Sequence, residues 1–282
     1  MGLNKEAIKI GFAYVGIVVG AGFSTGQEVM QFFTPFGLWS YIGVIISGFI
    51  LGFIGRQVAK IGTAFEAKNH ESTLQYVFGK KFSKVFDYIL VFFLFGIAVT
   101  MIAGSGSTFE QSFGIPTWLG ALIMTVLIYL TLLLDFNKIV RALGLVTPFL
   151  IIMVILIAVF YLFTGSISLG EVNSAMPETS AWKGIFWGLV YGGLAFAVGF
   201  STIVAIGGDA SKRRVSGAGA MFGGVLYAIL LALINFSLQT EYSKIKDVAI
   251  PTLNLAKGIH PWLGLVLTVI MLAVMYNTIL GL

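Results

Sequence analysis

Residues 16–28 read GIVVGAGFSTGQE and place four glycines, Gly16, Gly20, Gly22 and Gly26, inside an apolar segment near the start of the chain. Each glycine costs up to about 1 kcal/mol relative to alanine in a helix interior. Irregular backbone at membrane depth survives only beside a cavity or packed protein. The stretch therefore predicts a break in the first membrane helix, at a place where the chain does more than cross hydrocarbon.

A second copy of part of this stretch lies far along the chain. The string Gly22-Phe23-Ser24-Thr25 recurs as Gly199-Phe200-Ser201-Thr202, again near the middle of a long apolar segment. Each copy is in the first segment of what reads as a set of five. Secondary transporters with two structural repeats bind their solute where two interrupted helices meet. The recurrence therefore predicts a second break, near residues 198–201.

The composition is that of an integral membrane protein. Of the 282 residues, 58% are hydrophobic and 10% are charged, whereas about a quarter of the residues in soluble domains are charged. There is no cysteine, and both histidines, His70 and His260, fall in polar connections. No apolar segment carries a histidine, a cysteine or paired carboxylates, so the sequence favours neither an enzyme nor a bound cofactor.

Eight membrane helices are expected from apolar runs of about 20 residues. The runs are continuous, which favours helices over a barrel, whose strands alternate over about ten residues. The expected spans are 8–33, 38–55, 85–108, 116–134, 142–163, 182–206, 216–238 and 262 to the end.

The basic residues predict the orientation of these spans. Basic side chains gather on the cytoplasmic side of membrane proteins. The side that holds the N-terminus carries all but four of the 17 lysines and arginines, including Lys138 and Arg141; the four on the other side are Lys183, Lys244, Lys246 and Lys257. We therefore expect a multi-pass protein of a bacterial plasma membrane with a cytoplasmic N-terminus. The net charge of +5 indicates topology and not a nucleic-acid partner.

Two connections have patterns of their own. Residues 73–87 mix large apolar side chains with Lys80, Lys81 and Lys84, which is typical of a helix on an anionic membrane surface; a solvated basic loop is the alternative. Residues 251–260 are expected to form a short outer helix over the site.

Three groups of residues carry a family resemblance. The pattern Gly16-x-x-x-Gly20-Ala21-Gly22-Phe23 resembles the first-helix signature of the amino acid-polyamine-organocation (APC) superfamily. Gly199-Phe200 followed by residues 207–213 resembles its sixth-helix pattern, although the usual acidic pair is reduced here to Asp209 and Ser211. Residues 20–28, with Pro-Thr-Leu-Asn-Leu-Ala-Lys at 251–257, are most similar to the YkvI-like permeases of this superfamily.

The resemblance implies a LeuT-type fold, in which ten core helices form two inverted repeats of five, and solute uptake driven by a cation gradient. Applied to this all-α membrane chain, it assigns residues 1–164 to the first repeat, 165–181 to an extracellular linker and 182–282 to a second repeat with three helices. Two core helices are thus missing. The expected explanation is a fragment of a longer chain, with a natural eight-helix variant as the alternative.

The two predicted breaks are the expected substrate site. At a break, the freed N–H groups of the outer half attract an anion and the freed C=O groups of the inner half attract a cation. For Gly16 and Gly20, which are four residues apart, the alternative is close packing of two helices. For Ser201 and Thr202, the alternative is that their hydroxyls bond only to their own helix. The predicted substrate-binding residues are Gly20, Ala21, Gly22, Phe23, Ser24, Thr25, Phe200, Ser201 and Thr202.

Glu28 is the expected gating or proton-binding residue. It follows the break by about two turns, in the outer half of the first span. A carboxylate at that depth is costly unless it faces water or a partner. It would act as an outer gate, as a counter-charge for a substrate ammonium or as a proton acceptor; an interfacial position is the alternative.

A sodium ion is the expected coupling ion, with a proton as the alternative. The fifth span, 142–163, contains no lysine, the residue whose ammonium in some superfamily members resembles a substitute for bound sodium. The resemblance places sodium between the first-helix break and the eighth helix, and hard cations prefer oxygen ligands. For Thr278 the alternative is a hydroxyl buried within its helix that binds no ion. The expected ligands are the backbone carbonyls of Gly16, Ile17 and Val19 with Asn277 and Thr278.

These features together predict a cation-coupled symporter for a small zwitterionic or amine-bearing solute, such as an amino acid, working by alternating access within a lipid bilayer. A membrane sensor that binds the solute without moving it is one alternative. An ion channel is another, although the spans lack the rings of carboxylates and the filter-like loops that channels use.

Overall fold

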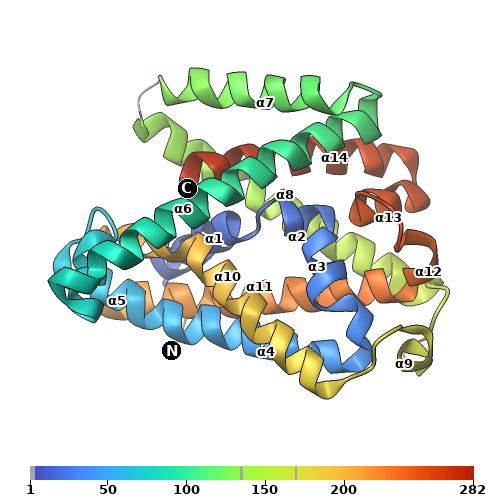
Figure 1. Ribbon diagram of the computed structural model, residues 1–282, viewed down its shortest axis with the longest axis horizontal. Helices are drawn as coiled ribbons and strands as arrows, with labels where there is room; N and C mark the ends of the chain where they lie inside the picture. Colours follow the sequence, from blue (N-terminus) through green and yellow to red (C-terminus); the bar gives the residue numbers. More distant parts are fainter. Residues whose placement is uncertain (1–3, 134–135, 169) are drawn as a thin grey trace.

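The computed structural model describes residues 4–133, 136–168 and 170–282, and the regular elements in these ranges are helices (Figure 1). For Ala21, Lys138 and Arg141 it describes the backbone only. The elements are α1 (Lys5–Val18), α2 (Ala21–Thr25), α3 (Gln27–Phe32), η1 (Thr34–Trp39), α4 (Ser40–Phe49), η2 (Ile50–Ile54), α5 (Gly55–Phe65), α6 (Glu71–Phe113), α7 (Thr117–Leu132), α8 (Phe136–Thr164), α9 (Val172–Ala175), α10 (Ala181–Gly208), α11 (Arg213–Thr240), α12 (Tyr242–Ile245), α13 (Pro251–Ile259) and α14 (Pro261–Gly281).

Six of the eight predicted membrane spans coincide with helices long enough to cross a membrane. By length and composition, six helical stretches within the described residues can span a membrane: Thr34–Phe65, Glu71–Phe113, Val146–Thr164, Ala181–Gly208, Arg213–Thr240 and Pro261–Gly281. The apolar helix α7 is shorter, at 16 residues, and the first expected span is divided into α1, α2 and α3. The all-α membrane architecture is therefore confirmed.

The first span is interrupted at the predicted place. After α1, Val19 has φ −75° and ψ 78°, the geometry of an inverse γ-turn, and the N–H of Gly20 donates to the carbonyl of Val18 at 2.9 Å. Gly20 is extended, with φ −81° and ψ −164°. A second change of direction follows at Gly26, whose φ of 81° lies in the left-handed region that favours glycine. The predicted break is confirmed.

The predicted second break is wrong, because α10 continues as one helix through Gly199. A Cβ added to Gly199 would lie 2.7 Å from both Tyr14 and Val18 of α1, and one added to Gly188 would overlap the backbone of Gly43 in α4. The glycines of α10 thus let neighbouring helices approach closely, as small residues do in membrane helix pairs. They are needed for packing, and the helix does not unwind.

Helices α1 and α10 run antiparallel across the centre of the molecule. At one end, the carboxylate of Glu6 accepts hydrogen bonds from the backbone N–H and the side-chain hydroxyl of Ser211, at 2.8 and 2.6 Å. Toward the other end, Glu28 accepts a hydrogen bond from Tyr191. The first and sixth expected spans therefore cross in opposite directions, as predicted.

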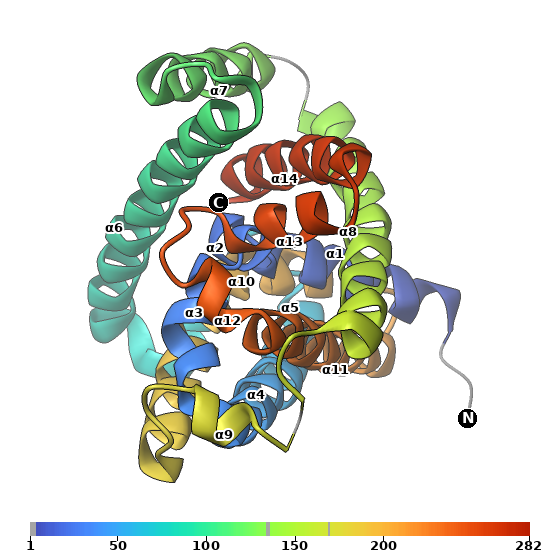
Figure 2. The ribbon, with the colours of Figure 1, turned by 90° about the vertical axis from the view of Figure 1, so that its right-hand side faces the viewer.

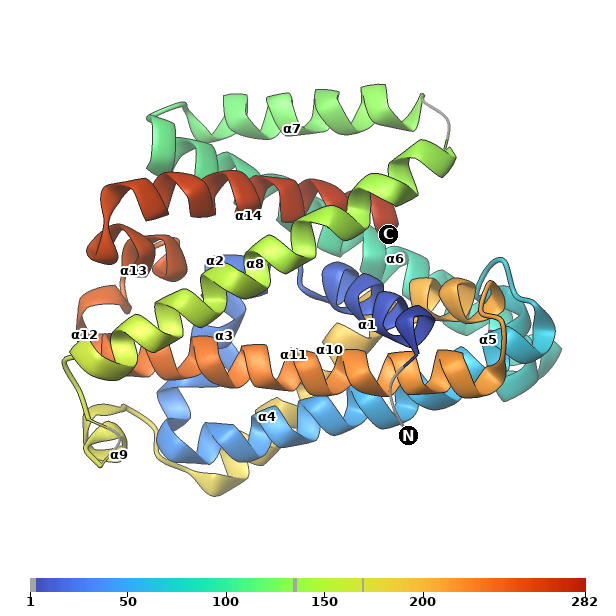
Figure 3. The same cartoon turned by 180° about the vertical axis from the view of Figure 1, so that it is seen from behind.

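The other helices surround this pair. Helix α1 packs mainly on α11, and α10 packs on α4 and α5. Figure 2 shows α6 and α8 on opposite sides of the central helices, with α14 between them and α7 on the outside. In Figure 3, α8 crosses the molecule diagonally between α11 and α14, which it contacts. The interrupted first span is thus enclosed by neighbours along its length.

The two connections singled out in the sequence are helical. Helix α6 begins at Glu71 and changes direction at Gly79, whose φ is 74°. The segment around this bend exposes Phe82 and Phe86 together with its lysines, which favours a membrane-surface segment over a solvated loop. The expected short outer helix is α13.

The antiparallel contact of α1 with the end of α10 predicts a cross-link. The chain contains no cysteine, so the pair Glu6→Cys and Ser211→Cys provides the only two thiols. We expect mild oxidation in membranes to join them, because both residues belong to one hydrogen-bonded contact. The matched control pairs Glu6→Cys with Lys183→Cys at the opposite end of α10. Electrophoresis after cleavage in the α6–α7 connection shows whether the two fragments remain joined. A cross-link in the control pair, or the absence of a cross-link in the Glu6–Ser211 pair, would contradict the antiparallel arrangement.

The same contact predicts a pH dependence. Hydrogen bonds from the Ser211 side chain and backbone hold the pKa of Glu6 below its ordinary value of 4.5. A carboxyl with a lowered folded-state pKa contributes stability above pH 4.5, and this contribution is lost as pH falls through the lowered pKa. Wild type should therefore melt at a higher temperature than Glu6→Gln at pH 6, and the difference should shrink as pH falls from 4.5 through the lowered pKa. A gap that does not change with pH would show that ionisation of Glu6 plays no part.

Candidate functional site

The interrupted first span brings Glu28 back against Gly22. The left-handed turn at Gly26 redirects the chain between α2 and α3. As a result, a Cβ added to Gly22 would overlap the side chain of Glu28. Gly22 therefore makes room for a carboxylate at the centre of the break, which explains the glycine without invoking helix packing.

A buried pair of tyrosines holds the Glu28 carboxylate. The Tyr191 hydroxyl from α10 donates to Glu28 Oε2 at 3.0 Å, and the hydroxyls of Tyr191 and Tyr227 lie 2.6 Å apart. Both tyrosines are buried. Glu28 thus points toward α10, although it is partly exposed. The sequence analysis missed Tyr191 and Tyr227, although a phenol in mid-span was a usable signal because a buried Tyr hydroxyl needs a partner.

Aromatic rings form the wall around this carboxylate. The ring centroid of Phe23 lies 5.4 Å from that of Tyr227, and those of Phe32 and Phe33 lie 5.3 and 4.9 Å from that of Tyr191. Phe23, one of the predicted substrate residues, is itself buried. The site therefore combines one carboxylate with rings that suit an apolar or cationic group.

The predicted residues Ser24 and Thr25 connect the break to its cover. The carbonyl of Ser24 accepts a hydrogen bond from Thr252 in α13 at 2.6 Å. The Thr25 hydroxyl donates to the carbonyl of Gly22 and accepts from the N–H of Gln27, so it provides an acceptor for the first N–H of α3. Helix α13 therefore lies directly on the outer side of the break.

The predicted residues of the second copy take part in other contacts. Ser201 Oγ lies 2.8 Å from His70 Nδ1, and His70 Nε2 lies 2.7 Å from Asp87 Oδ1. The ring of Phe200 lies 6.2 Å from that of His70, and the hydroxyl of Thr202 donates to the carbonyl of Gly281 at 3.4 Å. These residues join α10 to α6 and α14. Their hydroxyls are engaged by other helices, in contrast to the alternative in which they bond to their own helix.

The structure brings together the first-helix break and the end of α14. The side chain of Thr278 would lie 3.9 Å from a Cβ on Gly20, and a Cβ on Gly281 would lie 3.6 Å from Ile17. Asn277 and Thr278 are both buried. The Thr278 hydroxyl donates to the carbonyl of Val274 at 3.0 Å, which leaves its oxygen lone pairs to accept. The two helices expected to hold a cation are therefore adjacent.

A further hydroxyl, missed in the sequence, lies on the other side of this region. Gly16 faces the side chain of the buried Thr147 in α8, and a Cβ on Gly16 would overlap its Oγ1. Val19 is fully buried at the turn. Within the described ranges, no group of three or more His, Cys, Asp or Glu side chains could hold a metal ion. Any cation here would be bound by carbonyl and hydroxyl oxygens.

Comparisons with known sequences identify two bacterial relatives. No family model matches the chain. The uncharacterized membrane protein YkvI of Bacillus subtilis is 29% identical over 236 residues, which are 83% of this chain and 67% of the relative. The uncharacterized protein YyaD of the same organism is 27% identical over 149 residues, which are 53% of this chain and 43% of the relative. These likenesses are those of a bacterial membrane protein.

Solved structures show a similar fold. Two structures of the Eremococcus coleocola manganese transporter, one of a mutant and one with an aromatic bis-isothiourea compound, align with TM-scores of 0.54 and 0.52 at 15% identity. The alignments cover 96% and 97% of this chain but 62% of the transporter chains, so this chain spans less than two thirds of their length. Both are structures of a transporter and not of an enzyme. The chain is an all-helical membrane protein with a LeuT-like fold.

The contact of Gly22 with Glu28 predicts the cost of a side chain at this position. Gly22→Leu should destabilise the protein by about 1–3 kcal/mol, the usual cost of overpacking, because the new side chain must displace the carboxylate. Gly96→Leu is the matched control, because nothing lies within 4 Å of a Cβ on Gly96. Thermal unfolding of both variants in detergent provides the comparison. Equal melting temperatures would show that Gly22 has free space around it.

Proposed function

We propose that this chain is the core of a cation-coupled secondary transporter for a small amine-bearing or zwitterionic solute. The observation that supports the proposal most directly is the break at Gly20, which sets the partly buried carboxylate of Glu28 and its partner Tyr191 beside the interrupted backbone. Transporters of this architecture bind solute where a membrane helix is interrupted. The LeuT-like fold supports the same class of function.

The proposed solute site is centred on Glu28. Its carboxylate would pair with the ammonium of the solute, and the rings of Phe23, Tyr191 and Tyr227 would surround that cation. The first N–H groups of α2 have no acceptor within that helix, so they would hold the carboxylate of a zwitterion. Gly22 allows the solute to approach the backbone.

The proposed coupling site lies between α1, α8 and α14. The last carbonyls of α1, including Gly16 and Ile17, lose their intrahelical donors at the break. The hydroxyls of Thr147 and Thr278 would add hard oxygen ligands of the type that sodium prefers. Sodium here would neutralise the negative end of α1 and stabilise the interrupted conformation that the solute binds.

Polar contacts on the two sides of the break supply the proposed gates. On the inner side, Glu6 binds Ser211, and His70 joins Ser201 to Asp87. On the outer side, α13 is joined to the break by the hydrogen bond of Thr252 to the carbonyl of Ser24. Alternating access would open one set of contacts while the other set stays closed.

A divalent metal ion is a second candidate substrate. The two similar solved structures are of a manganese transporter, and Glu28 with nearby backbone carbonyls offers the oxygen ligands that Mn²⁺ accepts. We favour the amine-bearing solute because three aromatic rings contact or neighbour the Glu28–Tyr191 pair, and such rings stabilise organic cations better than strongly hydrated metal ions.

The proposal predicts a sodium-dependent binding equilibrium. We expect sodium, exchanged for choline at fixed pH, to raise the affinity of purified protein for its solute by about tenfold, within the usual range of coupling between sites. Amino acids, small amines and Mn²⁺ would be screened by thermal shift and then measured by calorimetry. Thr278→Val should remove the sodium effect. Thr125→Val is the matched control, because Thr125 makes the same type of hydrogen bond to its own helix but is exposed.

Glu28→Gln separates the roles of sodium and proton. It should weaken binding of every amine-bearing solute while leaving the ratio of affinities in sodium and choline unchanged. Affinity that ignores sodium but collapses in Glu28→Gln would make Glu28 the proton carrier. Binding of Mn²⁺ alone would favour the metal substrate. Binding without uptake into proteoliposomes would indicate a sensor, and sodium currents without solute would indicate a channel.

A further inference from the structure

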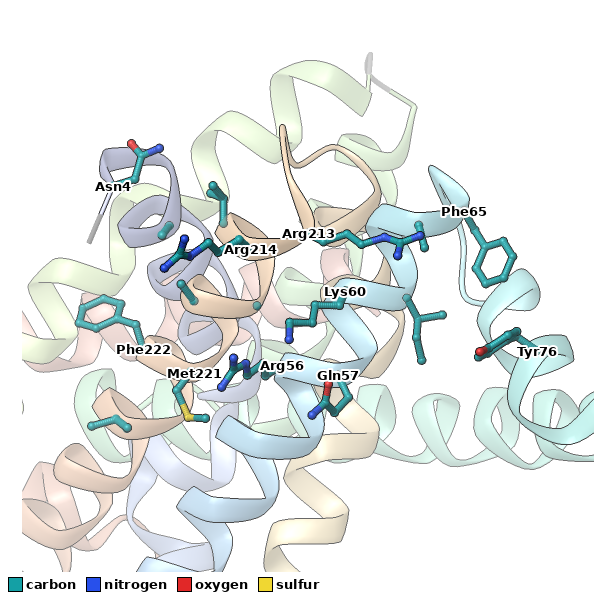
Figure 4. A pocket seen from close by; sticks show the side chains of 17 residues that line it. Asn4, Arg56, Gln57, Lys60, Phe65, Tyr76, Arg213, Arg214, Met221 and Phe222 are labelled. Atoms are coloured by element: carbon teal, nitrogen blue, oxygen red, sulfur yellow. The ribbon is translucent and has the colours of Figure 1, made fainter. Parts of the chain in front are cut away.

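A cavity of about 1260 Å³ opens between α1, α5, α6 and α11 (Figure 4). It lies at the end of the molecule that holds the N-terminus, the side that the distribution of basic residues assigns to the cytoplasm. Neither Glu28 nor its tyrosine partners line it. Seventeen residues line the cavity, and none of them is acidic. The cavity is therefore separate from the proposed transport site and has a different chemical character.

Four cationic side chains line this cavity. Arg56 and Lys60 come from α5, and Arg213 and Arg214 from the start of α11 (Figure 4). Arg56 and Lys60 are half-buried. In the part of the chain that the structure describes, neither they nor Arg213 forms an ion pair with an acidic side chain. Partly desolvated like charges repel one another, so this arrangement is stabilised when an anion joins them.

Apart from Asn4, Gln57 and Tyr76, the rest of the wall is apolar. Met221, Phe222 and Val225 continue the lining along α11, and Ile61 and Phe65 face it from α5. From Arg213 to Val225 the helix extends about 18 Å at 1.5 Å per residue. Along α11 the lining thus changes from cationic at Arg213 and Arg214 to apolar at Met221 and Val225, while Arg56 of α5 lies beside Met221 (Figure 4). This pattern matches an amphiphile with an anionic head and a hydrocarbon tail.

We propose that the cavity is a binding site for an anionic phospholipid of the cytoplasmic leaflet. The phosphate lies among Arg56, Lys60, Arg213 and Arg214, and an acyl chain follows the apolar wall toward Val225. A free phosphate would satisfy the cations but would leave the apolar wall uncovered, and a zwitterionic lipid would bring its own cation to the basic side chains. Basic pockets between membrane helices on the cytoplasmic side bind anionic headgroups in this way.

The bound lipid would hold the start of α1 in place. Asn4 and Ala7 line the same cavity, and the neighbouring Glu6 makes the contact with Ser211. A headgroup that bridges α5 and α11 would therefore pack against the segment of α1 that ends in the break. This effect does not depend on the identity of the transported solute.

The test compares lipids that differ only in the headgroup. Phosphatidylglycerol and phosphatidylcholine with the same acyl chains would be titrated onto the full chain in neutral detergent and followed by native mass spectrometry. We expect selective retention of phosphatidylglycerol. Neutralising two cations in Arg56→Gln/Lys60→Gln should lower that affinity about thirtyfold. The control Lys183→Gln/Lys246→Gln removes two exposed lysines outside the lining and should leave the affinity unchanged.

A charge-preserving variant and a soluble competitor provide two further tests of the lipid site. The charge-preserving variant Arg56→Lys/Lys60→Arg should retain binding, which separates loss of charge from loss of fold. Glycerol phosphate should compete only weakly, because it lacks the acyl chains. Equal retention of phosphatidylcholine, undiminished binding by the Gln variant, or displacement by glycerol phosphate at matching concentrations would each overturn the lipid site; the last would identify a site for a soluble phosphate.

Discussion

Inside hydrocarbon every backbone N–H and C=O needs a partner, and the interruption of the first helix leaves several without one. The structure meets this demand locally. Val18 accepts from Gly20 across the γ-turn, the Thr25 hydroxyl accepts from the first N–H of α3, and Thr252 of α13 donates to the carbonyl of Ser24. Helices α8, α10, α11 and α14 pack around α1 beside the break. Their arrangement is therefore a requirement of the interrupted backbone.

The carboxylate of Glu28 imposes a second requirement. A carboxylate shielded from water is tolerated only with hydrogen-bond partners; Tyr191 of α10 donates to Glu28, and the hydroxyl of Tyr227 of α11 in turn bonds that of Tyr191. Gly22 gives the carboxylate its space. A deletion of any one of these groups would leave the others with unsatisfied polar atoms in a low-dielectric interior, so the break, the carboxylate and the tyrosine pair form one unit.

The sequence predicted the membrane class, the break near Gly20 and the antiparallel crossing of the first and sixth spans, because apolar run length and clustered glycines act locally. It failed at Gly199, where the same four letters belong to a continuous helix. A glycine permits both unwinding and close packing, and the choice depends on the neighbouring helix, here Tyr14 and Val18 of α1. Tyr191, Thr147 and His70 were missed for the same reason: their partners lie on other helices, and no local pattern marks them.

The continuity of α10 has a mechanical consequence. From Tyr191 beside Glu28 to Ser201 beside His70 the helix rises about 15 Å at 1.5 Å per residue, without a hinge between them. A continuous helix tilts as one body, so a tilt at the Tyr191 end also moves the Ser201 end. The first span, divided twice, absorbs bending. The continuous helix α10 thus lies beside a first span that can bend at two places. Around the Glu28 carboxylate, α10 would tilt as one body while the parts of the first span would move separately.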